Sequence, residues 1–205
     1  MSQPFDRKAL IPAPGQPDPE LGEFWIGNPW LFTPVKRNLS AYERNRMFWN
    51  QAGQRFHDVS YLTSADSDGD GRTAVAADMD RDGRLDLWVR QVSGGPVMLF
   101  ENHLTPRHYL TVSLRGTRSN RLGVGARIIA EAGGRRLLRE LYPACCFLSQ
   151  QPHEVHFGLD DSTVVDRLTV QWPSGAVDVL RRVPGDQHIR VTEAAGQWRE
   201  VAAAK

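Results

Sequence analysis

Short apolar runs separated by Gly and Asp clusters make up the chain after residue 46. The runs Thr73–Ala77, Leu85–Val89 and Val97–Phe100 are each too short for a core helix. Met47–Asn50 and Leu99–Asn102 both place an apolar pair shortly before an Asn, and they lie about one propeller-blade length apart. This pattern predicts strands and turns over residues 47–105, forming one blade-like β repeat.

Alternating polar and apolar positions dominate the next stretch, residues 106–195. Gly-containing turns separate at least six short runs, which is the pattern of an antiparallel β-sandwich. The predicted strands are Tyr109–Leu114, Ala126–Ala130, Val155–Phe157, Arg167–Trp172, Val177–Leu180 and Ile189–Val191. Pro106 marks the boundary between the two domains, and residues 196–205 form a tail.

The first 46 residues are different in kind, because they hold seven of the chain's 13 prolines. Proline lacks an amide donor and fixes φ, which disfavours both a helix and a central strand. The aromatic residues Phe24, Trp25, Trp30 and Phe32 argue against a plain solvated linker. We therefore expect an extended arm over residues 1–46 that contacts the folded body or a partner.

The strand and turn patterns of residues 47–195 together predict an all-β fold class.

Charge and hydropathy exclude several classes of partner. The net charge of +1 gives no overall field that would draw the chain to nucleic acid. No apolar run approaches the roughly 18 residues of a transmembrane helix. Residues 1–8 lack the apolar stretch of a secretory signal, so we expect a processed form or another export route.

The strongest chemical signal is the aspartate loop, residues 78–86. Asp78, Asp80, Asp82 and Asp86 occupy positions 1, 3, 5 and 9 of the loop, with Gly83 at the sharp turn. At 4 Å each carboxylate pair costs about 1 kcal/mol even in water, so an ion is needed to offset the repulsion. The pattern predicts a Ca²⁺ site, because calcium prefers many oxygen ligands. Arg84 would add its main-chain carbonyl while its side chain faces water.

The loop is not a helix-loop-helix calcium hand. Val89 stands where that motif has its glutamate, and no helix signal flanks the loop. Upstream, Asp66, Asp68 and Asp70 begin a similar pattern, but Ala74 replaces the fourth carboxylate. Both a second ion and a polar loop that caps the blade fit this segment, and we favour the polar loop.

Other candidate chemistry is weaker. The adjacent cysteines Cys145 and Cys146 are interpreted as buried strand thiols, with a redox or metal-thiolate role as the alternative. His153 and His156 are three residues apart, which does not fit the helical zinc motif with its spacing of four. An arginine group is interpreted as solvated, with an anionic glycan or acidic partner as the alternative. Its members are Arg118, Arg121, Arg127, Arg135, Arg136 and Arg139.

Several segments in order resemble a known domain combination. Phe56–Val59, the aspartate loop and Leu99–Asn102 are similar to a VCBS or FG-GAP-like propeller repeat. The later motifs resemble the ASPIC/UnbV domain of cartilage acidic protein and of bacterial proteins named after enediyne biosynthesis. They are Leu110–Gly116, Ser119–Ala126, Leu148–Gln150, His156–Leu159 and Val170–Gly175.

The resemblance implies calcium-loaded repeats and an extracellular or periplasmic role in binding or adhesion. We therefore expect a calcium-stabilised, non-catalytic module that contacts another protein through the arm and the blade edges, as an adhesion module or assembly subunit. The alternative is an accessory or catalytic protein of a biosynthetic pathway, by analogy with the UnbV-like relatives. A pocket lined by acids or histidines with shifted pKa values would favour that alternative.

Overall fold

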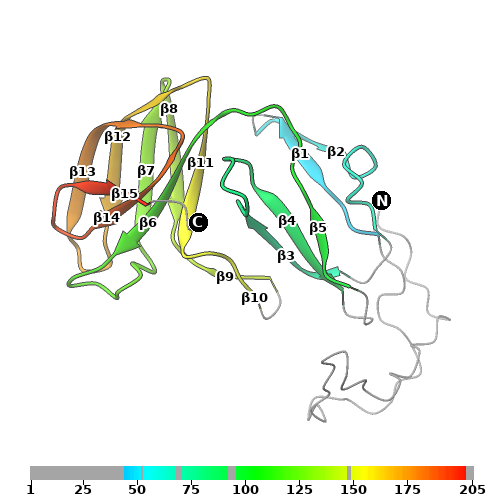
Figure 1. The fold of residues 1–205 in the computed structure, drawn as a ribbon, viewed down its shortest axis with the longest axis horizontal. Helices are drawn as coiled ribbons and strands as arrows, with labels where there is room; N and C mark the ends of the chain where they lie inside the picture. Colours follow the sequence, from blue (N-terminus) through cyan, green and yellow to red (C-terminus); the bar gives the residue numbers. More distant parts are fainter. Residues whose placement is uncertain (1–43, 52, 68–70, 92–95, 147–148, 202–205) are drawn as a thin grey trace, which may run out of the picture. The chain divides into compact units, whose positions relative to one another are not determined.

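The computed structural model describes residues 44–51, 53–67, 71–91, 96–146 and 149–201 (Figure 1). The described residues are strands, turns and loops, which confirms the all-β prediction. The predicted arm lies outside these ranges except for residues 44–46. The chain divides into two compact units, one containing residues 1–71 and 91–95 and the other residues 72–90 and 96–205.

The first unit contains an antiparallel hairpin of β1 (Phe48–Gln51) and β2 (Arg55–Asp58). The hairpin is tied to the following turn by Ser60, whose hydroxyl accepts a hydrogen bond from the amide of Met47 at 2.7 Å. Ser60 also donates to the Asp58 carboxylate, which holds the pKa of Asp58 below its usual value. Phe48, Trp49 and Phe56 are exposed in this hairpin.

A three-stranded sheet follows in the order β3-β4-β5, in which β4 and β5 pair antiparallel. Its strands are β3 (Gly71–Ala77), β4 (Asp86–Gln91) and β5 (Met98–Phe100), and the aspartate loop connects the first two. The described part of the repeat is therefore built from short β-hairpins, as the short apolar runs predicted.

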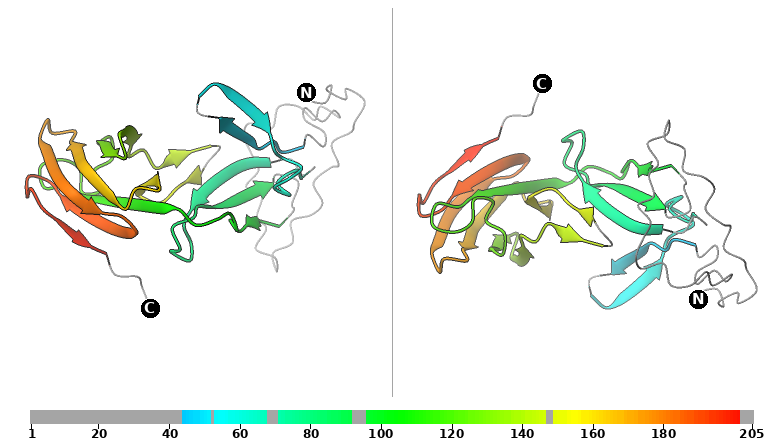
Figure 2. Two further views of the ribbon diagram at one scale, coloured as in Figure 1. Left: turned by 90° about the horizontal axis from the view of Figure 1, so that it is seen from above. Right: turned by 90° about the horizontal axis from the view of Figure 1, so that it is seen from below.

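Two four-stranded sheets form the predicted sandwich (Figure 2). The first has the order β11-β6-β14-β15 and the second β13-β12-β7-β8. The first sheet contains β6 (His108–Arg115), β11 (Glu154–Asp160), β14 (Gln187–Thr192) and β15 (Trp198–Glu200). The second contains β7 (Arg127–Ala132), β8 (Arg135–Glu140), β12 (Val164–Gln171) and β13 (Val177–Pro184).

The sandwich core lies between these sheets and follows the period-2 alternation of the strands. Phe157, Leu110 and Ile128 are fully buried there, together with residues from β12, β13 and β14. The pairing of β14 with β6 is parallel, which differs from the predicted antiparallel sandwich. The sequence separates these two strands by a long segment, and their pairing direction is set by that connection rather than by a hairpin turn.

A short hairpin of β9 (Ala144–Cys145) and β10 (Ser149–Gln150) precedes β11. Both cysteines are free thiols. Cys145 is half-buried and Cys146 is exposed, so neither thiol is buried as predicted, and the prediction was most clearly wrong for Cys146. The reason is the two-residue strand, which ends at Cys145 and leaves Cys146 in the turn with a φ of 49°.

Glu193 fixes two loops at one end of the sandwich. Its carboxylate accepts hydrogen bonds from the backbone amides of residues 117–119, each at 2.7 Å. It also accepts from the hydroxyls of Ser119 and Ser174. Burial opposes ionisation of Glu193, but these donors outweigh it and hold the pKa far below its ordinary value. The side chain therefore connects the loop after β6 to the turn between β12 and β13.

The Asp178 carboxylate likewise holds the turn after β14 through hydrogen bonds. It accepts hydrogen bonds from the indole of Trp172 at 2.7 Å and from the amide of Ala194 at 2.8 Å. Asp178 and Glu193 are both buried, and neither was singled out in the sequence. Buried carboxylates of this kind satisfy loop amides that no strand partner reaches.

The substitution Glu193→Gln should lower the urea midpoint at pH 7, because an amide accepts fewer of these hydrogen bonds and donates where donors already point. The carboxylate contribution is fully present above its unfolded pKa, near 4.5, and is lost as the pH falls toward the lowered folded pKa. The difference between wild type and variant should therefore be largest at pH 7 and shrink below about pH 4.5.

Urea denaturation at pH 7 and at pH 3 measures this difference. Glu101→Gln is the matched control, since Glu101 is exposed. A wild-type advantage over Glu193→Gln that is the same at both pH values would contradict the assignment.

Candidate functional site

The aspartate loop gathers three of its carboxylates around one point. The ligand oxygens of Asp78, Asp80 and Asp82 all lie within 4.8 Å of one another. The backbone turns sharply through the loop, with Arg81 at a φ of 61° and Gly83 at 88°. The predicted convergence of positions 1, 3 and 5 is therefore present in the fold.

Each of these carboxylates also holds the backbone of its own loop. Asp78 accepts from the amide of Gly83 at 3.0 Å, Asp80 from that of Asp82 at 3.2 Å, and Asp82 from that of Arg84 at 2.8 Å. These bonds use one oxygen of each side chain. The second oxygen of Asp78, Oδ1, is buried and has no hydrogen-bond partner. A cation would satisfy that atom, so the donor set fits a hard divalent ion.

The charges around Asp78 also favour a bound cation. Partial burial raises the pKa of Asp78, and the nearby charges of Asp82 and Asp80 raise it further. The carboxylates thus repel one another in the folded chain. A cation at their common centre would offset this repulsion.

Two predicted members of the site take positions beside this cluster. Asp86 is buried, and its carboxylate accepts from the amides of Asn102 at 3.0 Å and Met79 at 3.5 Å. Arg84 does not simply face water, because its guanidinium is half-buried and pairs with Asp82. The part of each residue in metal binding stays a prediction, while Asp86 closes the loop onto β5 and Arg84 offsets part of the loop's negative charge.

Tyr109 of β6 packs directly against the loop. A Cβ atom at Gly83 would lie 2.2 Å from Cδ1 of the Tyr109 ring, so only glycine fits there. Tyr109 also stacks on His156, with ring centroids 5.6 Å apart and planes 12° apart. The loop is therefore held against the sandwich by an aromatic contact as well as by its own hydrogen bonds.

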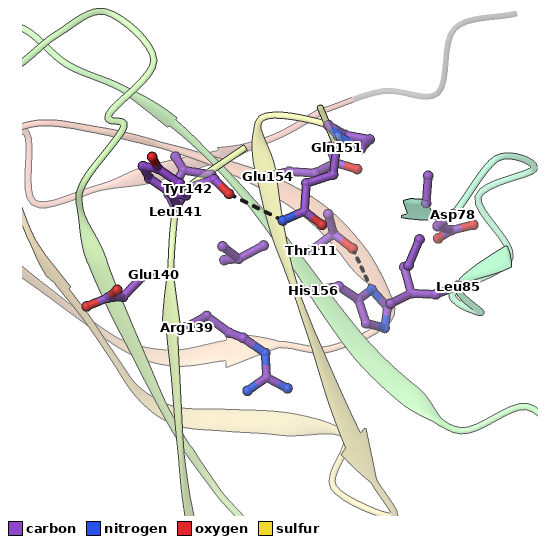
Figure 3. Close-up of a pocket in the computed structure, with 14 residues that line it drawn as sticks. Asp78, Leu85, Thr111, Arg139, Glu140, Leu141, Tyr142, Gln151, Glu154 and His156 are labelled. Carbon is purple, nitrogen blue, oxygen red and sulfur yellow. Dashed lines mark hydrogen bonds between the residues drawn. The ribbon is translucent and has the colours of Figure 1, made fainter. Parts of the chain in front are cut away.

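A row of polar side chains crosses the sheet beneath the loop. The strand register places Thr111 of β6 between His156 of β11 and His188 of β14. The Thr111 hydroxyl and His156 Nδ1 are 3.1 Å apart, and Figure 3 shows this pair beside Asp78 and Leu85. They line a cavity of about 170 Å³. This row was missed in the sequence, because its members come from strands far apart along the chain.

Several titratable groups near this row have shifted pKa values. Burial raises the pKa of Glu154 and lowers that of His156. Burial and the charges of Arg81 and Arg190 lower the pKa of His188 to about 4. Both histidines are therefore neutral near pH 7.

The other predicted candidates are less organised. Asp66 pairs with Arg44 at 3.0 Å, while Asp68 and Asp70 lie outside the described residues, so the favoured polar loop and the alternative of a second ion both stay predictions. In the arginine group, Arg127 pairs with Glu140 at 2.7 Å, and Arg136 lies opposite Glu131 in the strand register. Acidic neighbours thus accompany part of this surface, as the solvated interpretation predicted.

Comparison with known families covers both regions of the chain. Residues 37–89 match the model of an FG-GAP-like repeat, and residues 116–197 match the family described as ASPIC and UnbV. The chain carries an FG-GAP-like repeat followed by an ASPIC/UnbV domain. This confirms the resemblance drawn from the motifs. No curated protein matched the chain.

The two matches place the site within a known domain order. The aspartate loop belongs to the FG-GAP-like repeat, and the row of Thr111 and the two histidines lies in or just before the ASPIC/UnbV domain. Such domains indicate a β-propeller-type extracellular interaction module. The described part of the chain contains no helix with the length and apolar character of a membrane span.

The substitution Gly83→Ala should lower the free energy of unfolding by more than backbone strain alone would lower it. A residue other than glycine at this φ costs about 1–3 kcal/mol, and Tyr109 would also have to move. Gly175→Ala is the matched control, because Gly175 has a φ of 87° but open space around its Cβ position. Urea denaturation of both variants measures the difference. Equal losses would show that the Tyr109 contact contributes nothing.

Proposed function

We propose that this chain is a calcium-stabilised interaction module of the extracellular or periplasmic space. The proposal rests on the convergence of three carboxylates, whose ligand oxygens lie within 4.8 Å of one another. One oxygen of Asp78 in this cluster is also buried without a hydrogen-bond partner. Asp78, Asp80 and Asp82 would provide side-chain oxygens. The Arg84 carbonyl and Asp86 are proposed to complete or support the shell.

The role of the ion is structural in this proposal. Asp86 bonds the amide of Asn102, just after β5, and Gly83 packs against the ring of Tyr109 on β6. An ion at the carboxylates would thus stabilise the connection between β3 and β4 together with the surface of the sandwich that faces it. A rigid scaffold presents its exposed edges to a partner at a lower entropic cost.

Protein contacts are proposed for the arm, residues 1–46, and for the edges of the repeat. Phe48, Trp49 and Phe56 are more than half exposed, and unpaired strand edges recruit other chains. FG-GAP-type domains mediate protein interactions and are typical of extracellular or periplasmic proteins. Adhesion and service as an assembly subunit are both consistent with such a surface.

An accessory or catalytic role in biosynthesis is supported by one observation. The cavity in Figure 3 is lined by Asp78, Glu154 and His156, whose pKa values are all shifted. Its volume of about 170 Å³ is below the roughly 300–1,000 Å³ of ordinary ligand pockets. His156 is stacked on Tyr109 and bonded to Thr111, which fits a packed polar contact better than a general base. The interaction module is therefore the better supported function.

Calcium should raise the melting temperature of the full chain. For a Kd of 10⁻⁴–10⁻³ M, usual for extracellular modules, 1 mM Ca²⁺ adds about 0.4–1.4 kcal/mol to the free energy of unfolding. That corresponds to a rise of roughly 1–5 °C. Magnesium at the same concentration should give a smaller rise, because it gives up its water shell reluctantly.

Melting curves with Ca²⁺, Mg²⁺ and a chelator test this proposal. Asp80→Asn should abolish the calcium-dependent rise, whereas Asp166→Asn, a change at an exposed position on β12, should retain it. A wild-type chain that melts at the same temperature with calcium and with chelator would refute a stabilising ion.

A further inference from the structure

The adjacent thiols of Cys145 and Cys146 are reactive groups that the proposed function does not use. They are the chain's two cysteines, and both are free. Cys145 ends β9 and is half-buried, whereas Cys146 lies in the turn that follows and is exposed. Neither thiol can form a disulfide with a distant part of this chain. Each can therefore react only with its neighbour or with the sulfur of another molecule.

Both cysteines line the same open depression, which has a volume of about 630 Å³. Tyr142, Ala144, Ser149 and Gln150 complete its lining. The volume lies within the roughly 300–1,000 Å³ of ordinary ligand pockets. A small molecule that reaches Cys146 in this depression therefore also lies next to Cys145.

Each thiol donates its proton to an oxygen atom. The Ser149 hydroxyl donates to the Cys145 carbonyl at 2.7 Å, so the thiol is the donor in the 3.5 Å contact between Cys145 Sγ and Ser149 Oγ. Cys146 Sγ donates to the main-chain carbonyl of Ala74 on β3 at 3.1 Å. Thiols are weak hydrogen-bond donors, so a reacting thiol gives up either contact at a small cost in free energy.

The spacing of the two residues favours exchange over a permanent bridge. Adjacent Cα atoms lie about 3.8 Å apart across a trans peptide, and the described residues contain no cis peptide bond. Ordinary disulfides join Cα atoms about 4.4–6.8 Å apart, so a ring formed by neighbouring cysteines is strained and more easily reduced. Strained and exposed disulfides are the labile ones that take part in thiol–disulfide exchange.

We propose that Cys145 and Cys146 form a thiol–disulfide exchange site that reduces a small-molecule disulfide of peptide size. The exposed Cys146 attacks first, because access to the thiolate governs the rate. Its sulfur bonds to one sulfur of the reagent, the reagent's S–S bond breaks, and the first half leaves as a thiol with the proton that Cys146 gave up.

Cys145 resolves the mixed disulfide that results. Its thiolate attacks the Cys146 sulfur and expels the second half of the reagent, which takes the proton from Cys145. In total, two protein thiols are oxidised to one Cys145–Cys146 bridge, and one disulfide is reduced to two thiols. This chemistry requires neither calcium at the aspartate loop nor the interaction role proposed above.

Mass spectrometry of the reduced full chain treated with oxidised glutathione tests the site. After an acid quench, the main product should be a monomer that has lost two hydrogen atoms, preceded by a transient adduct with one glutathionyl group. Reduced glutathione in excess should restore the starting mass. A stable adduct that never loses its glutathionyl group, or disulfide-linked dimers as the main product, would overturn the proposal.

Two variants that each keep one thiol separate the attacking residue from the resolving one. Cys145→Ser should stop at the glutathionyl adduct of Cys146. Cys146→Ser should acquire a glutathionyl group about tenfold more slowly, because the remaining thiol is half-buried. Equal rates in the two variants would contradict the assigned order of attack, and the wild-type product tests the bridge even if a variant does not fold.

The bridge should also loosen the contact between the β9–β10 turn and β3. A disulfide sulfur carries no proton, so bridged Cys146 cannot donate to Ala74, which lies on the edge strand of its sheet. Hydrogen exchange of the amides of β3 and of Cys146 should be at least about twofold faster in the bridged chain, while the amides of β12 keep their rates. Equal rates at β3 and Cys146 in the reduced and bridged chains would contradict this coupling.

Discussion

Repulsion between neighbouring carboxylates is the constraint on which this account depends. Asp78, Asp80 and Asp82 bring oxygens within 4.8 Å of one another in a loop that is partly shielded from water. Burial raises the pKa of Asp78, the neighbouring charges of Asp82 and Asp80 raise it further, and the Arg84 guanidinium on Asp82 offsets only part of that repulsion. A divalent cation is the simplest way for such a loop to hold its shape at neutral pH.

Carboxylates hold other loops of the molecule in a related way. Glu193, Asp178 and Asp86 are buried, and each accepts hydrogen bonds from backbone amides of segments distant in sequence. Short strands leave long connections whose amides lack ladder partners, and an ionised acceptor satisfies several at once. The aspartate loop differs because its acceptors face one another, which leaves them in need of a positive charge.

The local features of the fold could be predicted from the sequence. Period-2 alternation located six of the eight sandwich strands but missed β8 and β15. The spacing of Asp78, Asp80 and Asp82 predicted their convergence, because that depends on neighbouring residues. The exposure of Cys146 was not predicted, since the two-residue length of β9 left no sequence signal.

Pairings between distant strands could not be predicted. The row of Thr111, His156 and His188 depends on the register of β6 with β11 and on the parallel pairing of β6 with β14. The positions of Glu193 and Asp178 depend likewise on loops brought together by the sheets. Alternation shows which face a side chain takes within one strand, but not which residue lies beside it in the next.

A crystal structure of the full chain grown with calcium, with anomalous scattering data, tests the central claim most directly. One anomalous peak is expected at the loop, with oxygens of Asp78, Asp80 and Asp82 about 2.3–2.6 Å from it. A calcium-saturated crystal with no peak at these carboxylates, or with the ion held elsewhere, would contradict it.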